Sequence, residues 1–142
     1  MEAVLLANAA ATLFMVGLAW FVGVVHYPLF ASVGERDFAA YHALHSRRTT
    51  WVVLPMMSVE LLSSFALCLD PPGGEAALAI AGALLALGTW ALTGAAAVPA
   101  HRRLGEGFSD AGLRSLRRAD LARAVVWTAH GVVVIALLAT QL

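Results

Sequence analysis

Four apolar runs, each long enough to cross a lipid bilayer, occupy most of this chain of 142 residues. They cover residues 3–25, 51–69, 76–98 and 121–142, and a longer interpretation extends the first run to Phe30. A membrane-spanning helix needs about 20 apolar residues, and lipid forces its backbone to satisfy its hydrogen bonds internally. Because 61% of the residues are hydrophobic and 13% are charged, little sequence remains for a soluble domain. The sequence therefore predicts an all-α, integral membrane four-helix bundle that forms one domain over residues 1–142.

Basic residues are distributed unevenly between the two sides of this predicted bundle. All nine are arginine, and each lies in or beside the connection between runs one and two or between runs three and four. The other side holds both termini and the loop at residues 70–75, which has no basic residue. Cytoplasmic loops are enriched in Lys and Arg, so we expect the Arg-rich connections in the cytoplasm, both termini outside, and a location in the bacterial inner membrane. The arginines are interpreted as contacts with the lipid bilayer, and no nucleic acid is expected as a partner.

Residues 35–50, between the first two runs, have the pattern of an amphipathic helix. Phe38, Tyr41, His42 and His45 recur at spacings of three and four, which places them on one helical face. Arginines at the other positions can reach lipid headgroups. We expect an interfacial helix here that packs across the mouth of the bundle.

Two ionisable residues lie deep inside the apolar runs. Glu60 is in the second run and His130 in the fourth, and each is nine positions in from the Arg-rich side, about 14 Å along a helix. An ionisable side chain near the bilayer centre costs about 2.5–3.5 kcal/mol on insertion scales, so it normally faces the protein interior and has a partner. We expect Glu60 and His130 to pair, as catalytic residues or as a structural lock. Arg123, one or two turns shallower, is expected to hold Glu60 ionised.

The five histidines and Glu60 all fall in the Arg-rich half of the predicted bundle. Imidazoles together with one carboxylate suit iron, copper or zinc. His42 and His45 can both point inward from one helix, as paired ligands do in bundle metal proteins. The sequence predicts a metal site with iron or copper favoured and zinc as an alternative, and its expected ligands are His26, His42, His45, Glu60, His101 and His130. His42, His45, His101 and His130 also have ordinary interpretations as interfacial, span-end or hydrogen-bonded residues.

Two other functional interpretations stay open. A haem, ligated by His26 and His130 with arginines near its propionates, is the first. In the second, Glu60 and His130 shuttle protons in a small transporter, or form part of a scaffold, without metal. Nucleophilic catalysis and nucleotide binding are not indicated, because the chain has no Gly-x-Ser-x-Gly and no phosphate-binding glycine loop.

Several motifs resemble a group of small bacterial four-helix membrane proteins. They are Gly-Val-Val-His-Tyr-Pro-Leu-Phe from residue 23, Phe-Ala-Ala-Tyr-His-Ala-Leu-His-Ser-Arg-Arg from residue 38, Val-Leu-Pro-Met-Met-Ser-Val-Glu-Leu from residue 53, and Val-Pro-Ala-His-Arg-Arg-Leu-Gly-Glu-Gly-Phe from residue 98. The group is distantly similar to anthrone oxygenase-like membrane proteins, which include enzymes that oxidise anthrones to anthraquinones. The resemblance implies a four-helix fold and one site formed by His26, His42, His45, Glu60 and His101. Arg123 matches an arginine that the group often carries near the start of its fourth span.

Together these patterns predict a membrane-embedded oxidoreductase or oxygenase. Its partner is expected to be a small lipophilic compound, aromatic or quinone-like, bound in the cytoplasmic half. Tyr41 and Trp127 are expected to flank this substrate. The third run contains Gly82, Gly88 and Gly94, which permit helices to pack closely. Such packing could occur between two copies of the chain, so a homo-oligomer is a further expectation.

Overall fold

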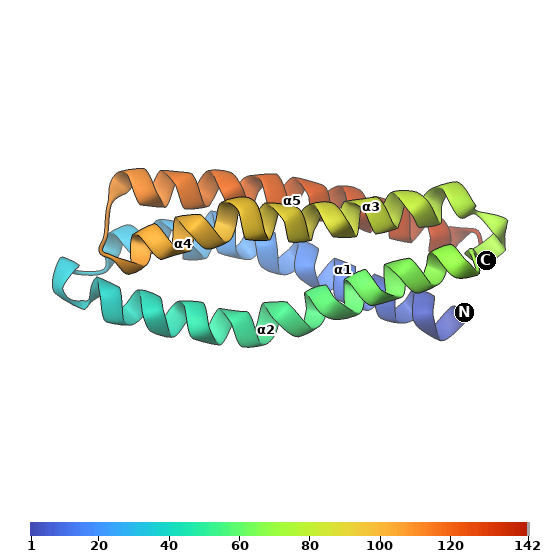
Figure 1. Ribbon diagram of the computed structural model, residues 1–142, viewed down its shortest axis with the longest axis horizontal. Coiled ribbons are helices and arrows are strands. Elements are labelled where there is room, and N and C mark those ends of the chain that lie inside the picture. Colours follow the sequence, from blue (N-terminus) through green and yellow to red (C-terminus); the bar gives the residue numbers. More distant parts are fainter. Residues whose placement is uncertain (142) are drawn as a thin grey trace.

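A computed structural model describes residues 1–141 as an antiparallel bundle of four long helical segments (Figure 1). The segments are Glu2–Ser32, Glu35–Leu69, Ala76–Gly105 and Asp110–Ala139, and each is long and apolar enough to cross a membrane. Large apolar side chains such as Leu62 and Val132 point outward, as expected where lipid is the solvent. The predicted all-α membrane four-helix bundle is confirmed.

Two of the four segments contain irregular turns. The elements in chain order are α1 (Glu2–Phe21), η1 (Val22–His26), η2 (Pro28–Ser32), α2 (Glu35–Leu69), η3 (Pro72–Gly74), α3 (Ala76–Leu92), η4 (Thr93–Ala97), α4 (Val98–Gly105) and α5 (Asp110–Ala139). Both η1 and η4 are π-helical turns, which occur frequently at functional sites. Each precedes a proline, which cannot donate a backbone hydrogen bond to the preceding turn.

Residues 35–50 are helical as expected, but they form the first turns of α2 and not a separate helix across the bundle mouth. Their apolar face is covered by the chain itself, because Phe38 is fully buried in a cluster with Phe30, Leu104 and Leu116. Pro55 lies in the interior of this long helix, where it removes one backbone hydrogen bond.

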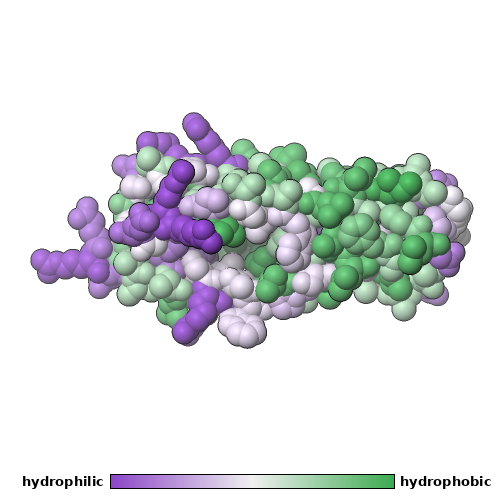
Figure 2. All heavy atoms as spheres, in the orientation of Figure 1, coloured by the Kyte–Doolittle hydropathy of each residue, from purple (hydrophilic) through white to green (hydrophobic). Residues whose placement is uncertain are grey.

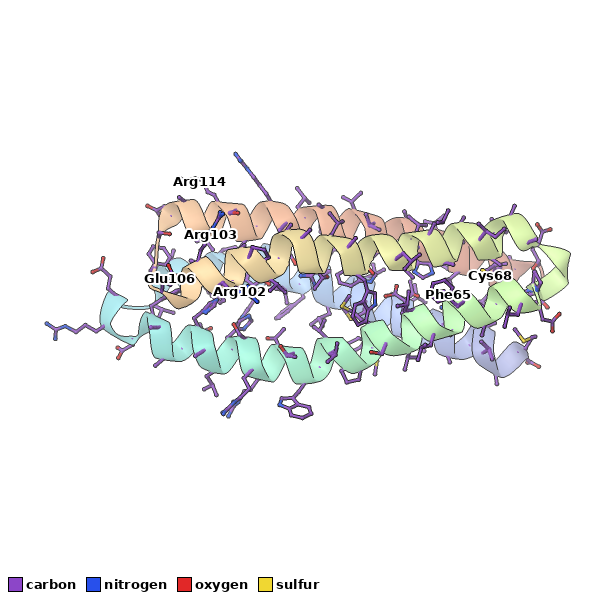
Figure 3. The ribbon with its side chains drawn as sticks, in the orientation of Figure 1. Phe65, Cys68, Arg102, Arg103, Glu106 and Arg114 are labelled. Carbon is purple, nitrogen blue, oxygen red and sulfur yellow. The ribbon has the colours of Figure 1, made fainter. Side chains whose placement is uncertain are left out.

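The two ends of the bundle differ in polarity. Both termini lie at one end (Figure 1), and hydrophilic residues gather at the opposite end (Figure 2). Figure 3 shows Arg102, Arg103 and Arg114 at this hydrophilic end, whereas Phe65 and Cys68 lie towards the other. The arginines and the termini therefore lie at opposite ends of the bundle, as predicted. That the Arg-rich end faces the cytoplasm stays a prediction.

The glycines of α3 and η4 have different surroundings. A Cβ atom at Gly82 would lie 3.3 Å from Nε2 of His130, so this glycine lets α3 approach α5 closely. A Cβ atom at Gly88 would make an ordinary contact with Val126, and one at Gly94 would meet no atom within 4 Å. Gly82 therefore serves packing inside one chain.

Candidate functional site

Glu60 and His130 pair in the interior of the bundle, as predicted. The Nδ1 atom of His130 lies 2.8 Å from Oε1 of Glu60, and the indole N–H of Trp127 donates to Oε2 over 3.0 Å. The three side chains are at most 1% exposed. Both carboxylate oxygens therefore have partners, which is the arrangement that a buried charge requires.

Hydrogen bonds from α1 complete this layer. The side-chain amide of Asn8 donates to the backbone carbonyl of Glu60 over 3.0 Å and also lies within 2.9 Å of the Ser63 and Ser64 hydroxyls. Side chains from α1, α2 and α5 thus join in one buried polar layer. Such a satisfied layer fixes how the helices pack against one another.

Four histidines form a separate cluster at the Arg-rich end. Nε2 of His26 lies 2.9 Å from Nδ1 of His45, and Nε2 of His42 lies 3.1 Å from Nδ1 of His101. The stacked rings of His45 and His101 connect the two pairs, with centroids 5.8 Å apart. The hydroxyl of Tyr27 lies 3.2 Å from Nε2 of His101 and supports it. Three segments of the chain contribute these imidazoles, and we refer to His26, His42, His45 and His101 as the histidine cluster.

The distances between ring nitrogens in the histidine cluster are compatible both with hydrogen bonds between the rings and with binding of a metal ion. A neutral imidazole has one donor and one acceptor nitrogen, so two rings can share a hydrogen bond. Two nitrogens that bind one metal ion at about 2.0–2.1 Å also lie roughly 3 Å apart. Within residues 1–141, no three His, Cys, Asp or Glu side chains are already arranged to hold a metal ion. Metal binding here would therefore require the imidazole rings to turn.

A cavity of about 630 Å³ lies beside the histidine cluster and extends into the bundle. Its walls are mainly apolar, and its deeper part is lined by Met15, Met57, Trp90 and Trp127. The Trp90 indole is held by donation to the Met57 carbonyl over 3.2 Å. The polar side chains that line it include His42, His45, His101, Asp120 and Arg123. The volume and this mixture of surfaces are typical of a site for a small organic ligand.

Four buried polar atoms around this cavity make no hydrogen bond within the protein. They are His45 Nε2, Ser46 Oγ, Asp120 Oδ2 and Arg123 Nε. Among residues 1–141, the other such atom is the hydroxyl of Thr12, which does not line the cavity. Buried polar atoms nearly always have a partner, so their concentration here indicates a place for polar groups of a ligand or for ordered water.

The structure divides the six predicted metal ligands into two sets. His26, His42, His45 and His101 come together, whereas Glu60 and His130 bond to one another and do not line the cavity. Trp127 lies between the sets, because its ring lines the cavity while its N–H bonds to Glu60. His26 and His130, the predicted axial ligands of a haem, are thus not brought together. The expectation of a single six-residue site came from residue type, from position in the Arg-rich half and from the resemblance, and none of these resolves layers a few turns apart.

Two other predicted residues have roles different from those expected. The guanidinium of Arg123 lies 4.8 Å from the centre of the Trp127 ring, a cation–π contact, and makes no ion pair with Glu60. Tyr41 packs edge-on against Phe30 with ring centroids 5.7 Å apart and does not line the cavity. Trp127 does line it, and its expected place beside a substrate stays a prediction.

The sequence reasoning missed Asp120 as a site residue. Its side chain is 2% exposed, lines the cavity, and lies where Gly23 leaves room: a Cβ atom on that glycine would be 2.5 Å from Oδ2. The signal was available, because Asp120 and Arg123 are three positions apart on one helix and so share a face. Its position at the edge of an apolar run made it appear to belong to a loop.

Comparisons with known protein families, with characterised proteins and with solved structures find no match to this chain.

Proposed function

We propose that this protein is a membrane-embedded oxidoreductase or oxygenase that acts on a small lipophilic compound. The observation that carries the proposal is the cavity beside the histidine cluster, where unpaired buried polar atoms meet mainly apolar walls. With the Arg-rich end in the cytoplasm, the site lies in the cytoplasmic half of the bundle.

The lining of the cavity favours an aromatic or quinone-like ligand. The rings of Trp90 and Trp127 and the flexible thioether of Met57 offer surfaces on which a flat ring can pack. The unpaired Nε of Arg123 and the unpaired hydroxyl of Ser46 offer hydrogen bonds to one or two oxygen atoms of a ligand. A ligand with a fused or substituted ring and few oxygens meets both requirements.

The histidine cluster is the part of the chain suited to a metal ion. Four imidazoles fit iron or copper, with zinc as an alternative, and Nε2 of His45 is a buried nitrogen that still lacks a partner. The hydroxyl of Tyr27 lies 3.2 Å from Nε2 of His101 and would orient that ring, as hydrogen-bond partners of ligating histidines commonly do. When bound, iron or copper would supply the redox chemistry that the side chains lack.

The proposed reaction uses dioxygen as the oxidant. In the oxidase form, two hydroquinones lose four electrons and four protons in total, and one dioxygen takes them up as two waters. In the oxygenase form, one oxygen atom converts a ring CH₂ to a carbonyl and the other leaves with the two hydrogens as water. The apolar cavity would bind and orient the ring in both forms.

Glu60 and His130 are assigned a positioning role in this proposal. Their pair holds the indole of Trp127, which lines the cavity. A transporter would instead need ionisable groups that are accessible from a polar path. Both carboxylate oxygens of Glu60 are engaged by neighbouring side chains, which favours the positioning role.

The proposal is tested with the protein in lipid nanodiscs, loaded with ferrous iron or cuprous copper. An alkylated hydroquinone serves as the probe, and oxygen uptake is followed with quinone absorbance. We expect turnover to fall by about a hundredfold or more in His101→Ala, because loss of even an outer-shell partner of a metal ligand costs about 10–100-fold, and to persist in Arg36→Ala, an exposed control at the same end. Two results would contradict the proposal: an oxidation rate that His101→Ala leaves unchanged, or a rate no higher than that of the free metal ion without protein.

A further inference from the structure

The cavity opens on the side of the bundle and not only at its end. Its exposed lining residues fall on two segments: Ala43, Thr50 and Leu54 on α2, and Gly94, Val98 and Arg102 on η4 and α4. Figure 2 shows a recess on this face of the molecule, next to the hydrophilic end. The opening therefore lies between α2 and the segment of η4 and α4.

Helix irregularities occur on both sides of this opening. Pro55, next to the rim residue Leu54, interrupts the hydrogen bonds of α2, and α2 bends near its middle (Figure 1). Across the opening, η4 is a π-helical turn that contains Gly94. Because Gly94 has no side chain, nothing at this position narrows the opening between α2 and η4. Each side of the opening thus contains an irregularity in its helix.

We infer that the lipophilic ligand enters the cavity sideways, from the bilayer, through this opening between α2 and η4. The inference deepens the proposed function and rests on it for the identity of the ligand. Most of the rim is apolar, because only Thr50 and Arg102 among its exposed residues have polar side chains. The apolar side chains of Leu54 and Val98 are 48% and 40% exposed on helices that can span the membrane. A compound dissolved among acyl chains can pass such a rim without being exposed to water. Arg102 at the polar end of the rim is placed to attract the oxygen atoms of the ligand.

Gly94 provides a direct test of the passage. A Cβ atom there meets nothing within 4 Å and the position is exposed, so a side chain can begin at Gly94 without a clash. Gly17 on α1 is a matched control: it is also an exposed helical glycine with nothing within 4 Å, but it does not line the cavity. Gly94→Leu and Gly17→Leu therefore add the same side chain to the same kind of surface.

In the first experiment, a decyl-benzoquinone is mixed with protein in nanodiscs, and binding is followed by quenching of tryptophan fluorescence. We expect Gly94→Leu to slow association by about tenfold and Gly17→Leu to leave it unchanged. Equal association rates in both variants would overturn lateral entry. If the unsubstituted protein does not bind the quinone saturably, the proposed function fails, and the route is judged by the second experiment alone.

The second experiment needs no ligand. Thr93, which lines the cavity, is changed to Cys in a Cys68→Ala background, and two maleimides are compared in nanodiscs. We expect an alkyl maleimide that partitions into lipid to label this cysteine, a sulfonated maleimide to label it much more slowly, and Gly94→Leu to slow the first reaction. Faster labelling by the sulfonated reagent, or labelling that Gly94→Leu does not slow, would overturn the proposal.

Discussion

At the scale of single residues, the burial of the Glu60 carboxylate makes its two hydrogen-bond partners important for stability. The carboxylate is fully buried on a membrane-spanning helix and depends on His130 and Trp127 for its hydrogen bonds. In an apolar interior, an unpaired carboxylate costs more than the pair contributes, because its lost hydration is not replaced. The three side chains should therefore act as one unit in stability measurements.

We predict that His130→Ala lowers the free energy of unfolding by about 2–4 kcal/mol, because it leaves one oxygen of Glu60 without a partner. The measurement is reversible unfolding in mixed detergent micelles. Glu60→Ala with His130→Ala should cost less than the sum of the two single changes. Glu2→Ala, at an exposed position, is the control. Strict additivity of the pair would show that the two residues do not interact.

At the scale of elements, the π-helical turns explain why some site residues could be predicted and others could not. Glu60 and His130 lie in regular helix, so their depth was readable from the sequence. A π turn adds about one residue, which rotates the following helix by about 100° and changes which face is inward. His26 ends one such turn and His101 follows the other. Their partners therefore depended on tertiary packing, which periodicity alone does not contain.

The continuity of α2 could be anticipated only in part. The shared face of Phe38, Tyr41, His42 and His45 was readable from spacing, and Phe38 and His42 are indeed buried. The sequence did not show that the chain itself covers this face, because Leu104 and Leu116, which pack there, are distant along the chain. An amphipathic pattern cannot distinguish a headgroup surface from a neighbouring segment.

The contact of α3 with α5 gives a prediction at the element scale. Gly82→Val should lower stability by about 1–3 kcal/mol, because its side chain would press on the ring of His130 and separate the helices. Gly94→Val, at a position facing open space in the same helical segment, should change stability much less. Thermal unfolding of both variants in one detergent compares them. A similar loss of stability in Gly82→Val and Gly94→Val would show that Gly82 does not determine how closely α3 packs against α5.

At the scale of the whole molecule, the uneven arginine distribution gives the bundle a predicted orientation. The four spans bring both termini to one end and the arginines to the other (Figures 1 and 2). Composition and run length sufficed to predict this architecture. The site required contacts between helices: the Glu60–His130 pair and the grouping of four histidines were predicted, whereas their separation into two sets and the place of Asp120 were not.

Orientation is tested with two exposed glutamates in the loops at opposite ends. In a Cys68→Ala background, Glu75→Cys should react with an impermeant maleimide in intact bacterial cells, because its loop is expected outside. Glu106→Cys should react only after the cells are made permeable. The reverse pattern would place the Arg-rich end, and with it the cavity, outside the cell.

We predict that the histidine cluster holds a metal ion and that Glu60, which bonds to His130 and Trp127, takes no part in binding it. The most direct measurement is metal content by mass spectrometry, with a visible spectrum, after iron or copper loading in mild detergent. We predict near-stoichiometric metal in the unsubstituted protein and in Glu60→Gln, and its loss in His42→Ala and in His101→Ala. A protein that takes up no metal, an equal loss in Glu60→Gln, or the Soret band of a haem would contradict it.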